Sequence, residues 1–473
     1  MKTIFTPQKY KIEDKINEPF IDTDEILEFL EEGKGCSLEE IKSIIAKSLS
    51  KQRLTMLETS KLINATSKEA IDLILEGAAT IKRNIYGNRI VLFAPLYVGN
   101  YCQNKCVYCG FNKDNKETIR KTLTTDELTA EVEALEDAGH KRLILVYGEH
   151  TKYDADFIAD NVRQVYKIKK GHGEIRRVNI NAAPFDIEGY KKIKAAGIGT
   201  FQVFQETYNK QLYPKYHLFG KKTDFDYRIL SHDRAMLAGI DDVGLGALMG
   251  LGDWRFEVLG LIRHTNHLES CFGVGPHTLS FPRIKEATGV DASAFIPVSE
   301  ADFVRMVAIL RIAVPYTGLI LTAREDEDVR HEVIKYGVSQ IDGGTNINIG
   351  GYSHPDSTHK DQFKINDDRS LASVIDKLLE GNYIPSFCTA CYVKGRTGEH
   401  FMEFSVPGFI KNICTPNAIL TLTEYLEDYG SPETKKKGYE VIAREVARLD
   451  VERKSECEAR ITRIKNGERN LLF

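Results

Sequence analysis

Three cysteines lie close together in the segment that begins at Tyr101. They are Cys102, Cys106 and Cys109, and their spacing is CxxxCxxC. Three thiolates can hold three irons of a four-iron cube and leave the fourth iron without a protein ligand. A closed zinc site needs a fourth ligand at paired spacing, and no Cys or His follows nearby. The pattern therefore favours a 4Fe-4S cluster with one iron open to chemistry.

A second group of cysteines occurs late in the chain. Cys388 and Cys391 are separated by two residues, and Cys414 follows in the loop before Pro416. A zinc knuckle is the alternative, but a fourth partner at normal spacing is missing, and His400 is the nearest candidate. A second, auxiliary iron–sulfur cluster is the favoured interpretation. The cysteines that stand alone, which we expect to be structural thiols, are Cys36, Cys271 and Cys457.

The elements that must position these cysteines alternate between short apolar runs and amphipathic segments. The runs that fit strands are 89–96, 142–147, 178–181, 200–204, 242–249, 277–281, 319–322 and 340–343. Strands separated by helices favour parallel pairing, and eight such units predict an α/β fold, a (β/α)8 barrel of the TIM type. Active sites of such barrels lie where the strands end, and the first cysteine set directly follows the first run.

Changes of pattern along the chain predict three regions. They are a helical N-terminal extension at 1–88, the barrel at 89–350 and a mostly helical C-terminal cluster domain at 351–473. The last helix is expected to begin near Pro432, which suits a first helical position, and to run towards Lys465.

Helix start signals support this division. Capping boxes are predicted where Ser37 precedes Glu40, Thr55 precedes Glu58, Thr66 precedes Glu69 and Thr124 precedes Glu127. A polar, loop-rich stretch at 354–368 follows the barrel.

The charges exclude several classes of partner. The net charge is −4, from 64 basic and 68 acidic residues that are interspersed along the chain. Neither nucleic acid nor a membrane surface is indicated as a partner. No apolar run approaches the roughly 20 residues that span a bilayer, and the first residues are too polar for a signal peptide. We therefore predict a cytoplasmic protein with a small substrate.

Carboxylates and an arginine stand at or after the ends of predicted strands. Glu149 closely follows the second strand, which ends at Tyr147, and Glu206 follows the fourth strand beside Gln205. A carboxylate there suits two ribose hydroxyls, because it accepts two hydrogen bonds. Arg228 follows in the next helix, and its guanidinium suits a carboxylate. The alternative for Glu206 and Arg228 is a surface ion pair.

Two further groups are candidates for binding. Arg324 ends the seventh predicted strand, where it could clamp a substrate carboxylate or form a structural salt bridge with Glu325 or Asp326. His264 and His267 share one face of the helix after the fifth strand and could reach a metal together. A packed or solvated histidine is the more frequent outcome for such positions.

Taken together, these motifs resemble those of the radical S-adenosylmethionine superfamily, including the aromatic Tyr108 before the last cysteine of the first set. Within it, they resemble the tyrosine lyase that matures the active-site H-cluster of FeFe-hydrogenases. The CTACY sequence at 388–392 with Cys414 is the specific part, because the similar tyrosine lyase of thiazole biosynthesis lacks this set. The barrel segments shared with the wider lyase group are 205–208, 253–255, 280–283 and 350–352. The superfamily usually has Gly-Gly-Glu where this chain has Tyr147, Gly148 and Glu149.

The resemblance implies a two-site reaction. Reduction of the first cluster cleaves S-adenosylmethionine to methionine and a 5′-deoxyadenosyl radical, which takes a hydrogen from the amino group of L-tyrosine. The Cα–Cβ bond breaks and gives p-cresol and dehydroglycine. The second cluster, which carries an additional labile iron, converts dehydroglycine to carbon monoxide and cyanide. The implied partners are a reducing protein such as ferredoxin or flavodoxin and other hydrogenase maturation proteins.

The resemblance also implies roles for individual residues. Arg324 matches the position that binds the substrate carboxylate, Tyr97 lines the substrate site, and His264 is the ligand of the additional iron, with His267 as its competitor. The residues implied around S-adenosylmethionine are Tyr108, Tyr147, Glu149, Gln205, Glu206 and Arg228.

Three other functions remain as alternatives. The thiazole-pathway lyase, 2-iminoacetate synthase, would stop at dehydroglycine. An enzyme resembling biotin synthase would consume a cluster as its sulfur donor and have no use for Arg324. An iron–sulfur electron carrier would not cleave the cofactor at all.

Overall fold

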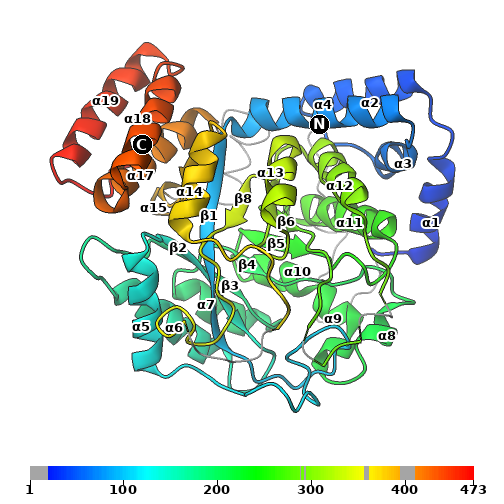
Figure 1. Cartoon of the computed structure of the whole chain (residues 1–473). Helices are drawn as coiled ribbons and strands as arrows, with labels where there is room; N and C mark the ends of the chain where they lie inside the picture. The colour runs from blue at the N-terminus through cyan, green and yellow to red at the C-terminus, as the bar shows by residue number, and fades with distance from the viewer. Residues whose placement is uncertain (1–19, 288, 292–294, 356–361, 395–410) are drawn as a thin grey trace.

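The structure is a computed structural model that describes residues 20–287, 289–291, 295–355, 362–394 and 411–473. A parallel barrel lies at its centre (Figure 1). Within the described residues, eight strands close the barrel in the order β2-β3-β4-β5-β6-β7-β8-β1, and β1 pairs with β2. The strands are β1 (Arg89–Gly99), β2 (Arg142–Tyr147), β3 (Arg177–Asn181), β4 (Phe201–Gln202), β5 (Val243–Gly246), β6 (Thr278–Ser280), β7 (Gly318–Leu321) and β8 (Gln340–Asp342). The predicted (β/α)8 fold and its eight strands are confirmed.

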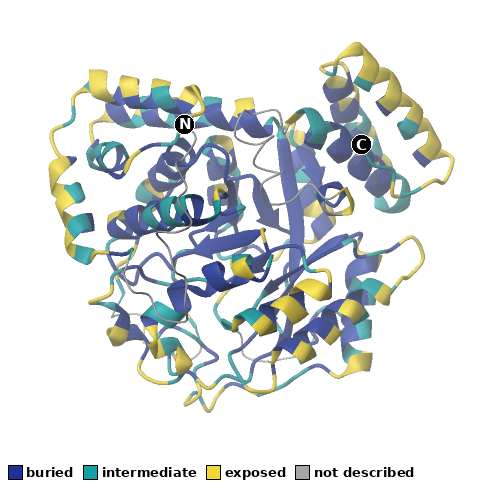
Figure 2. Ribbon diagram, turned by 180° about the vertical axis from the view of Figure 1, so that it is seen from behind, coloured by how far each residue is buried: buried dark blue, intermediate teal, exposed yellow. Residues whose placement is uncertain are grey.

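Helices cover the outside of the barrel and turn their polar faces to solvent. In Figure 2 the strands are almost entirely dark blue, whereas the surrounding helices carry yellow, exposed outer faces. The barrel strands read as continuous buried runs because both faces of the sheet are covered. The helices of this layer are α5 (Thr125–Asp137), α6 (Ala155–Lys167), α7 (Ile187–Ala195), α8 (Tyr213–Tyr216), α9 (Phe225–Ile229), α10 (Ser231–Leu237), α11 (Trp254–Phe272), α12 (Glu300–Ala313) and α13 (Glu327–Tyr336).

Four helices precede the barrel: α1 (Thr23–Glu32), α2 (Leu38–Leu49), α3 (Met56–Asn64) and α4 (Lys68–Tyr86). The capping boxes predicted at Ser37 and Thr55 are confirmed, as is the one at Thr124 that starts α5. The third N-terminal start lies one residue later than predicted. There the hydroxyl of Ser67, not that of Thr66, accepts a hydrogen bond from the amide of Ala70.

The chain after the barrel forms α14 (Leu371–Glu380), β9 (Ile384–Ser386), α15 (Ala390–Val393), α17 (Lys411–Tyr429), α18 (Pro432–Val446) and α19 (Val451–Lys465). Strand β9 was not predicted, and it pairs with the first residues of β1. The prediction of one long final helix was wrong. The helix stops at Ala447, and Asp450 starts a new one by accepting a hydrogen bond from the amide of Arg453. None of the helices in the described ranges has the length and apolar character to cross a membrane.

The loop that carries the first cysteines is fixed to the end of β2. The amide of Gly148 donates to the carbonyl of Gly99 over 2.9 Å, and the amide of Gln103 donates to the carbonyl of Glu149 over 2.8 Å. A Cβ atom at Gly148 would lie 2.2 Å from the backbone oxygen of Tyr101. Glycine is therefore required at Gly148 for the two backbones to approach.

We expect Gly148→Ala to lower the free energy of unfolding by about 1–3 kcal/mol, because the added methyl group overpacks against a backbone oxygen. The midpoint of urea unfolding measures this change. Gly343→Ala is the matched control, since its Cβ would meet the terminal methyl of Leu371 at 3.3 Å, and that side chain can move. Equal losses in the two variants would contradict the close approach at Gly148.

Candidate active site

The first cysteine set lines a cavity at the end of the barrel where the strands stop. Cys102, Cys106 and Cys109 all form part of its wall. The backbone of this loop pairs with the end of α8 and the segment after it. The amide of Val107 donates to the carbonyl of Tyr216 over 3.1 Å, and the amide of Lys105 donates to the carbonyl of Phe219 over 2.9 Å. Burial raises the pKa of the Cys106 thiol to about 12. Burial also raises the pKa of the Cys109 thiol, so a bound cation is needed before these two sulfurs become thiolates near neutral pH.

Two carboxylates and two cations face each other in the same cavity. Nζ of Lys222 lies 2.6 Å from Oε1 of Glu206, and the guanidinium of Arg228 lies 3.7 Å from Glu149 and 3.9 Å from Glu206. The amide of Asn104 donates to Oε2 of Glu149 over 2.7 Å. All five side chains line the cavity and the four charged ones are largely buried, so the alternative of a surface ion pair does not describe them. Lys222 was not foreseen, because it lies in a three-residue 3-10 helix, Lys221–Thr223, which is too short to leave a pattern in the sequence.

The position of Glu206 is fixed by a buried carboxylate behind it. Glu206 has a φ of 72°, in the left-handed region that is costly for residues other than glycine. The hydroxyl of Thr207 and the amide of Tyr208 donate to the carboxylate of Glu257 over 2.5 and 2.7 Å. Burial raises the pKa of Glu257 to about 7. The neighbouring Gln205 does not line the cavity, and its amide nitrogen lies 3.4 Å from the carbonyl of Phe225.

Arg324 follows β7 and lines the cavity wall. Its guanidinium carbon lies 3.3 Å from the centre of the Phe363 ring. Glu325, the predicted structural partner of Arg324, instead forms ion pairs with Arg283 and Lys285. The guanidinium of Arg324 is therefore presented to the cavity and is not held by the carboxylate of Glu325.

A second aromatic residue links the cavity to the first cysteine set. The hydroxyl of Tyr97 donates to Oε1 of Gln362 over 2.9 Å, and Nε2 of Gln362 lies 3.6 Å from Sγ of Cys109. Gln362 and Phe363 belong to the polar stretch 354–368, for which the sequence predicted only a loop. The composition of that stretch carried no signal that two of its residues enter the cavity.

Tyr108 and Tyr147 also line this cavity. The hydroxyl of Tyr108 lies 2.8 Å from Nε2 of His217, and the hydroxyl of Tyr147 accepts from the amide of Asn161 over 3.3 Å. Burial raises the pKa of both phenols, so both remain neutral. Neither phenol adds charge to the cavity.

The second cysteine set comes together at the opposite end of the barrel, where the strands begin. Cys391 is in hydrogen-bond contact with both Cys388 and Cys414. A guanidinium nitrogen of Arg177, the first residue of β3, lies 3.4 Å from the carbonyl oxygen and 3.9 Å from the sulfur of Cys388. The hydrogen bond from Cys391 and three neighbouring arginines hold the pKa of Cys388 well below its usual value. His400, the alternative zinc ligand, lies outside the described residues.

A histidine that the sequence did not single out lies near this second set. His277 immediately precedes β6, and its Nδ1 lies 3.6 Å from the carboxylate of Asp242. Burial lowers the pKa of His277, while Asp242 and the sulfur of Cys388 act in the opposite direction. The usable signal was its place at the beginning of a strand, at the end of the barrel that carries the late cysteines.

The histidine that was predicted for the second cysteine set has other neighbours. His264 is fully buried on α11, where its Nδ1 lies 3.0 Å from the hydroxyl of Tyr208. Its ring also packs against Phe20 and His232 at 5.3 and 5.1 Å. Among the described residues, its contacts include none of the three late cysteines. Because α11 lies in the outer layer, the structure does not bring His264 and this cysteine set together.

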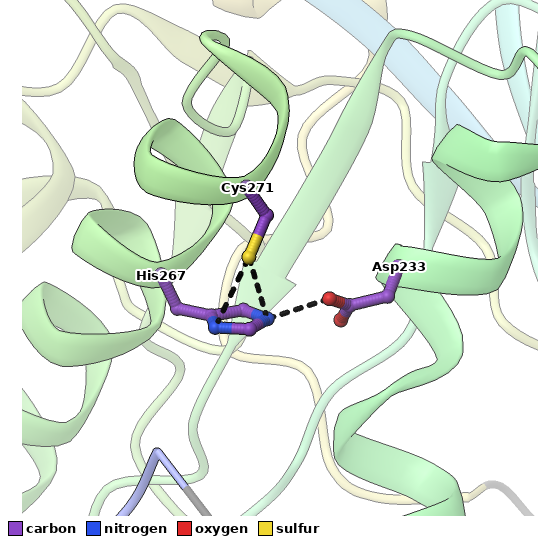
Figure 3. Close-up of side chains that lie close together, drawn as sticks. All are labelled: Asp233, His267 and Cys271. Carbon is purple, nitrogen blue, oxygen red and sulfur yellow. Dashed lines mark hydrogen bonds and ion pairs between the residues drawn. The ribbon is translucent and has the colours of Figure 1, made fainter. Parts of the chain in front are cut away.

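His267, the competitor of His264, is part of another cluster (Figure 3). Its Nε2 lies 2.5 Å from Oδ1 of Asp233, and the sulfur of Cys271 lies 3.6 and 3.8 Å from the two ring nitrogens. Each ring nitrogen of His267 directs its lone pair outward in the plane of the ring. A sulfur at nearly equal distances from both nitrogens lies off both of these directions, so it does not bind a metal ion together with either nitrogen. Phe20 stacks on the ring at 3.8 Å and restricts its rotation. We therefore interpret the cluster as a packed structural contact that is built on the hydrogen bond between Asp233 and His267.

Both cysteine sets have a donor chemistry that fits an iron–sulfur cluster. Each offers three sulfurs, and the carboxylates and guanidinium beside the first set match the ammonium, ribose and carboxylate groups of S-adenosylmethionine. The arginines beside the second set supply positive charge for an anionic, thiolate-bound cluster.

Comparison with known proteins agrees with this site. The radical SAM superfamily matches residues 96–263, and the biotin and thiamin synthesis associated domain matches residues 280–384. The 2-iminoacetate synthase of Salmonella typhimurium is 30% identical over 336 residues, which is 71% of this chain and 87% of that enzyme.

Two solved structures are similar over nearly the whole chain. One is HydG, described as a maturase of the FeFe-hydrogenase, with 46% identity, coverage of 96% of this chain and 100% of that chain, and a TM-score of 0.93. The other is the FeFe-hydrogenase maturase HydG from Carboxydothermus hydrogenoformans, with 37% identity, coverage of 93% and 97%, and a TM-score of 0.81. The chain therefore belongs to the radical SAM superfamily and, within it, to the HydG-type FeFe-hydrogenase maturases.

Proposed function

We propose that this protein cleaves the Cα–Cβ bond of L-tyrosine to p-cresol and dehydroglycine, and then converts dehydroglycine to carbon monoxide and cyanide. The observation that carries the proposal is that two sets of three cysteines lie at opposite ends of one barrel. The first set shares a cavity with paired charges, and the second lies beside buried arginines and His277. The similarity to HydG structures at both ends of the chain supports the same proposal.

The residues of the first cavity would bind and orient the first cluster and S-adenosylmethionine. Cys102, Cys106 and Cys109 would hold the first cluster, while Glu149, Glu206 and Arg228 would hold S-adenosylmethionine. When bound, these two groups supply a carbon radical that removes a hydrogen atom from the substrate amino group. The electrons come from a low-potential reducing protein of the ferredoxin or flavodoxin class.

Arg324 would position the tyrosine. Its guanidinium lies on the ring of Phe363. This contact would fix the orientation of the two N–H donors that bind the two oxygens of a carboxylate. Tyr97 and Gln362 would line the other side of the substrate. The residues that line the cavity would limit the access of water to the reacting centre and hold one hydrogen near the radical.

The second set would act on dehydroglycine. Cys388, Cys391 and Cys414 would hold the second cluster, and we propose His277, in place of His264, as the ligand of an additional iron. That iron would supply a metal centre for the second reaction, and His277 would hold it. One dehydroglycine yields one carbon monoxide, one hydrogen cyanide and one water, so the atoms balance without an added oxidant. The products are then passed to other hydrogenase maturation proteins.

A 2-iminoacetate synthase is the second candidate, because such an enzyme is 30% identical to this chain. It would make p-cresol and dehydroglycine and stop there. Carbon monoxide formed from tyrosine by the reconstituted protein distinguishes the two functions.

We expect Arg324→Gln to raise the KM for tyrosine by about 10- to 100-fold, because a charge-assisted bidentate hydrogen bond of about 1.5–3 kcal/mol is lost. Cleavage of S-adenosylmethionine without tyrosine should persist. Steady-state p-cresol formation measures the effect. Arg369→Gln, which removes a partly exposed arginine paired with Asp367, is the control and should leave KM unchanged. An unchanged KM in Arg324→Gln would refute the clamp.

We expect the double variant Cys388→Ser and Cys391→Ser to keep p-cresol formation and to lose carbon monoxide, because only the second cluster loses its ligands. Both products are measured on the same anaerobically reconstituted sample. Cys36→Ser, at a partly exposed thiol outside both sets, should keep both products. Loss of both products to the same extent in the double variant would refute the division between two sites.

His277→Gln should keep p-cresol formation and lower carbon monoxide formation at least about tenfold, together with a loss of iron from each chain, because a second-site ligand is removed. His264→Gln should retain that iron, since its described contacts are with Tyr208, Phe20 and His232. The iron content of each chain and the formation of carbon monoxide are measured for both variants. Loss of iron and carbon monoxide formation in His264→Gln, with both retained in His277→Gln, would instead support His264 as the ligand.

A further inference from the structure

Arginine is the first residue of three neighbouring strands, at the end of the barrel where the second cysteine set lies. Arg89 is the first residue of β1, Arg142 of β2 and Arg177 of β3, and Arg142 and Arg177 lie opposite each other in the strand register. Their exposed fractions are 5%, 1% and 1%. Buried guanidiniums need anions or hydrogen-bond acceptors beside them, because removing their charge from water is costly.

Two of these arginines have described partners that fix them in place. Arg177 reaches the carboxylate of Asp242 at 3.3 Å and both the carbonyl and the sulfur of Cys388. Arg142 donates to the side-chain oxygen of Gln340 over 2.9 Å. These contacts anchor the side chains of Arg142 and Arg177, and neither side chain lines the small cavity between the late cysteines.

Arg89 differs from the other two because it lines the small cavity between the cysteines. Its side chain forms the wall of that cavity together with Cys388, Cys391 and Cys414. Its Nε is buried and has no hydrogen-bond partner among the described residues. Nε and a terminal nitrogen of a guanidinium form a fork that matches the two oxygens of one carboxylate.

We propose that Arg89 binds the carboxylate of a small organic acid at the second cysteine set and so orients the substrate of the second reaction. This inference rests on the proposed function, in which that substrate is dehydroglycine, an α-imino acid. A simple counter-ion for the cluster would need only the positive charge of Arg89. A carboxylate site also needs its Nε donor, so the two roles can be separated.

Glyoxylate is a suitable probe, because it has the carboxylate of dehydroglycine and an oxygen in place of the imine nitrogen. It is titrated into the reduced holoenzyme with S-adenosylmethionine at the first site, and the electron paramagnetic resonance signal of the second cluster is followed. We expect a saturable change in the wild type and at least tenfold weaker binding in Arg89→Gln. Arg234→Gln is the matched control, since it removes an equally buried guanidinium that donates to the carbonyls of Phe185 and Tyr227. The control should bind glyoxylate as the wild type does.

Arg89→Lys keeps the charge and loses the fork, so it tests the geometry even if Arg89→Gln fails to assemble the second cluster. We expect Arg89→Lys to retain its iron and to bind glyoxylate several-fold more weakly than the wild type. Binding as tight as in the wild type, no response of the wild type to glyoxylate, or loss of the second cluster in both variants would overturn the proposal.

The same samples separate this proposal from the proposed function. Formation of p-cresol should be equal in the wild type and both Arg89 variants, because the first cavity is unchanged. A wild type that binds glyoxylate but makes no p-cresol from tyrosine would refute the proposed function, while the carboxylate site would stand.

Discussion

The common direction of the eight barrel strands is the constraint on which both cysteine sets depend. Since the strands are parallel, every residue that follows a strand is brought to one end of the barrel, and every residue that begins a strand is brought to the other. The first cysteine loop follows β1, Glu149 follows β2 and Arg324 follows β7, so they share a cavity. Arg89 and Arg177 begin their strands, and they meet the late cysteines. One topological rule thus creates two separate sites.

The same rule explains what the sequence could predict. Strand ends are local signals, so the barrel and most of the first cavity followed from apolar runs and the residues after them. His264 was predicted from the spacing of two histidines on a helix, and its described contacts include none of the late cysteines. His277 immediately precedes β6, at the end of the barrel that carries those cysteines, and this place at a strand end was the signal available for it. Lys222 and Gln362 enter the first cavity from turns and loops, where the sequence has no periodicity to read.

The two cysteine sets have the same donors and opposite electrostatic surroundings. The first cavity is lined by three cations, Lys222, Arg228 and Arg324, and by three carboxylates, those of Glu149, Glu206 and Asp342. The charges therefore balance, and burial keeps the Cys106 thiol protonated without a metal. At the second set the hydrogen bond from Cys391 and three neighbouring arginines hold the pKa of the Cys388 thiol well below its usual value. The first site is therefore a charge-balanced pocket with partners for both the ammonium and the carboxylate of S-adenosylmethionine, and the second site attracts anions.

Backbone strain marks one residue in each site. Glu206 and Cys388 have φ values of 72° and 49°, where residues other than glycine are disfavoured by roughly 1 kcal/mol or more. Each is held by surrounding hydrogen bonds, from the residues after Glu206 to the carboxylate of Glu257, and from the amide of Cys388 to Ser386 over 3.3 Å. Glycine would relieve the strain but lacks the carboxylate or the thiol. The strain persists because the surrounding structure fixes the flanking backbone, and under the proposed function both side chains have a role at these positions.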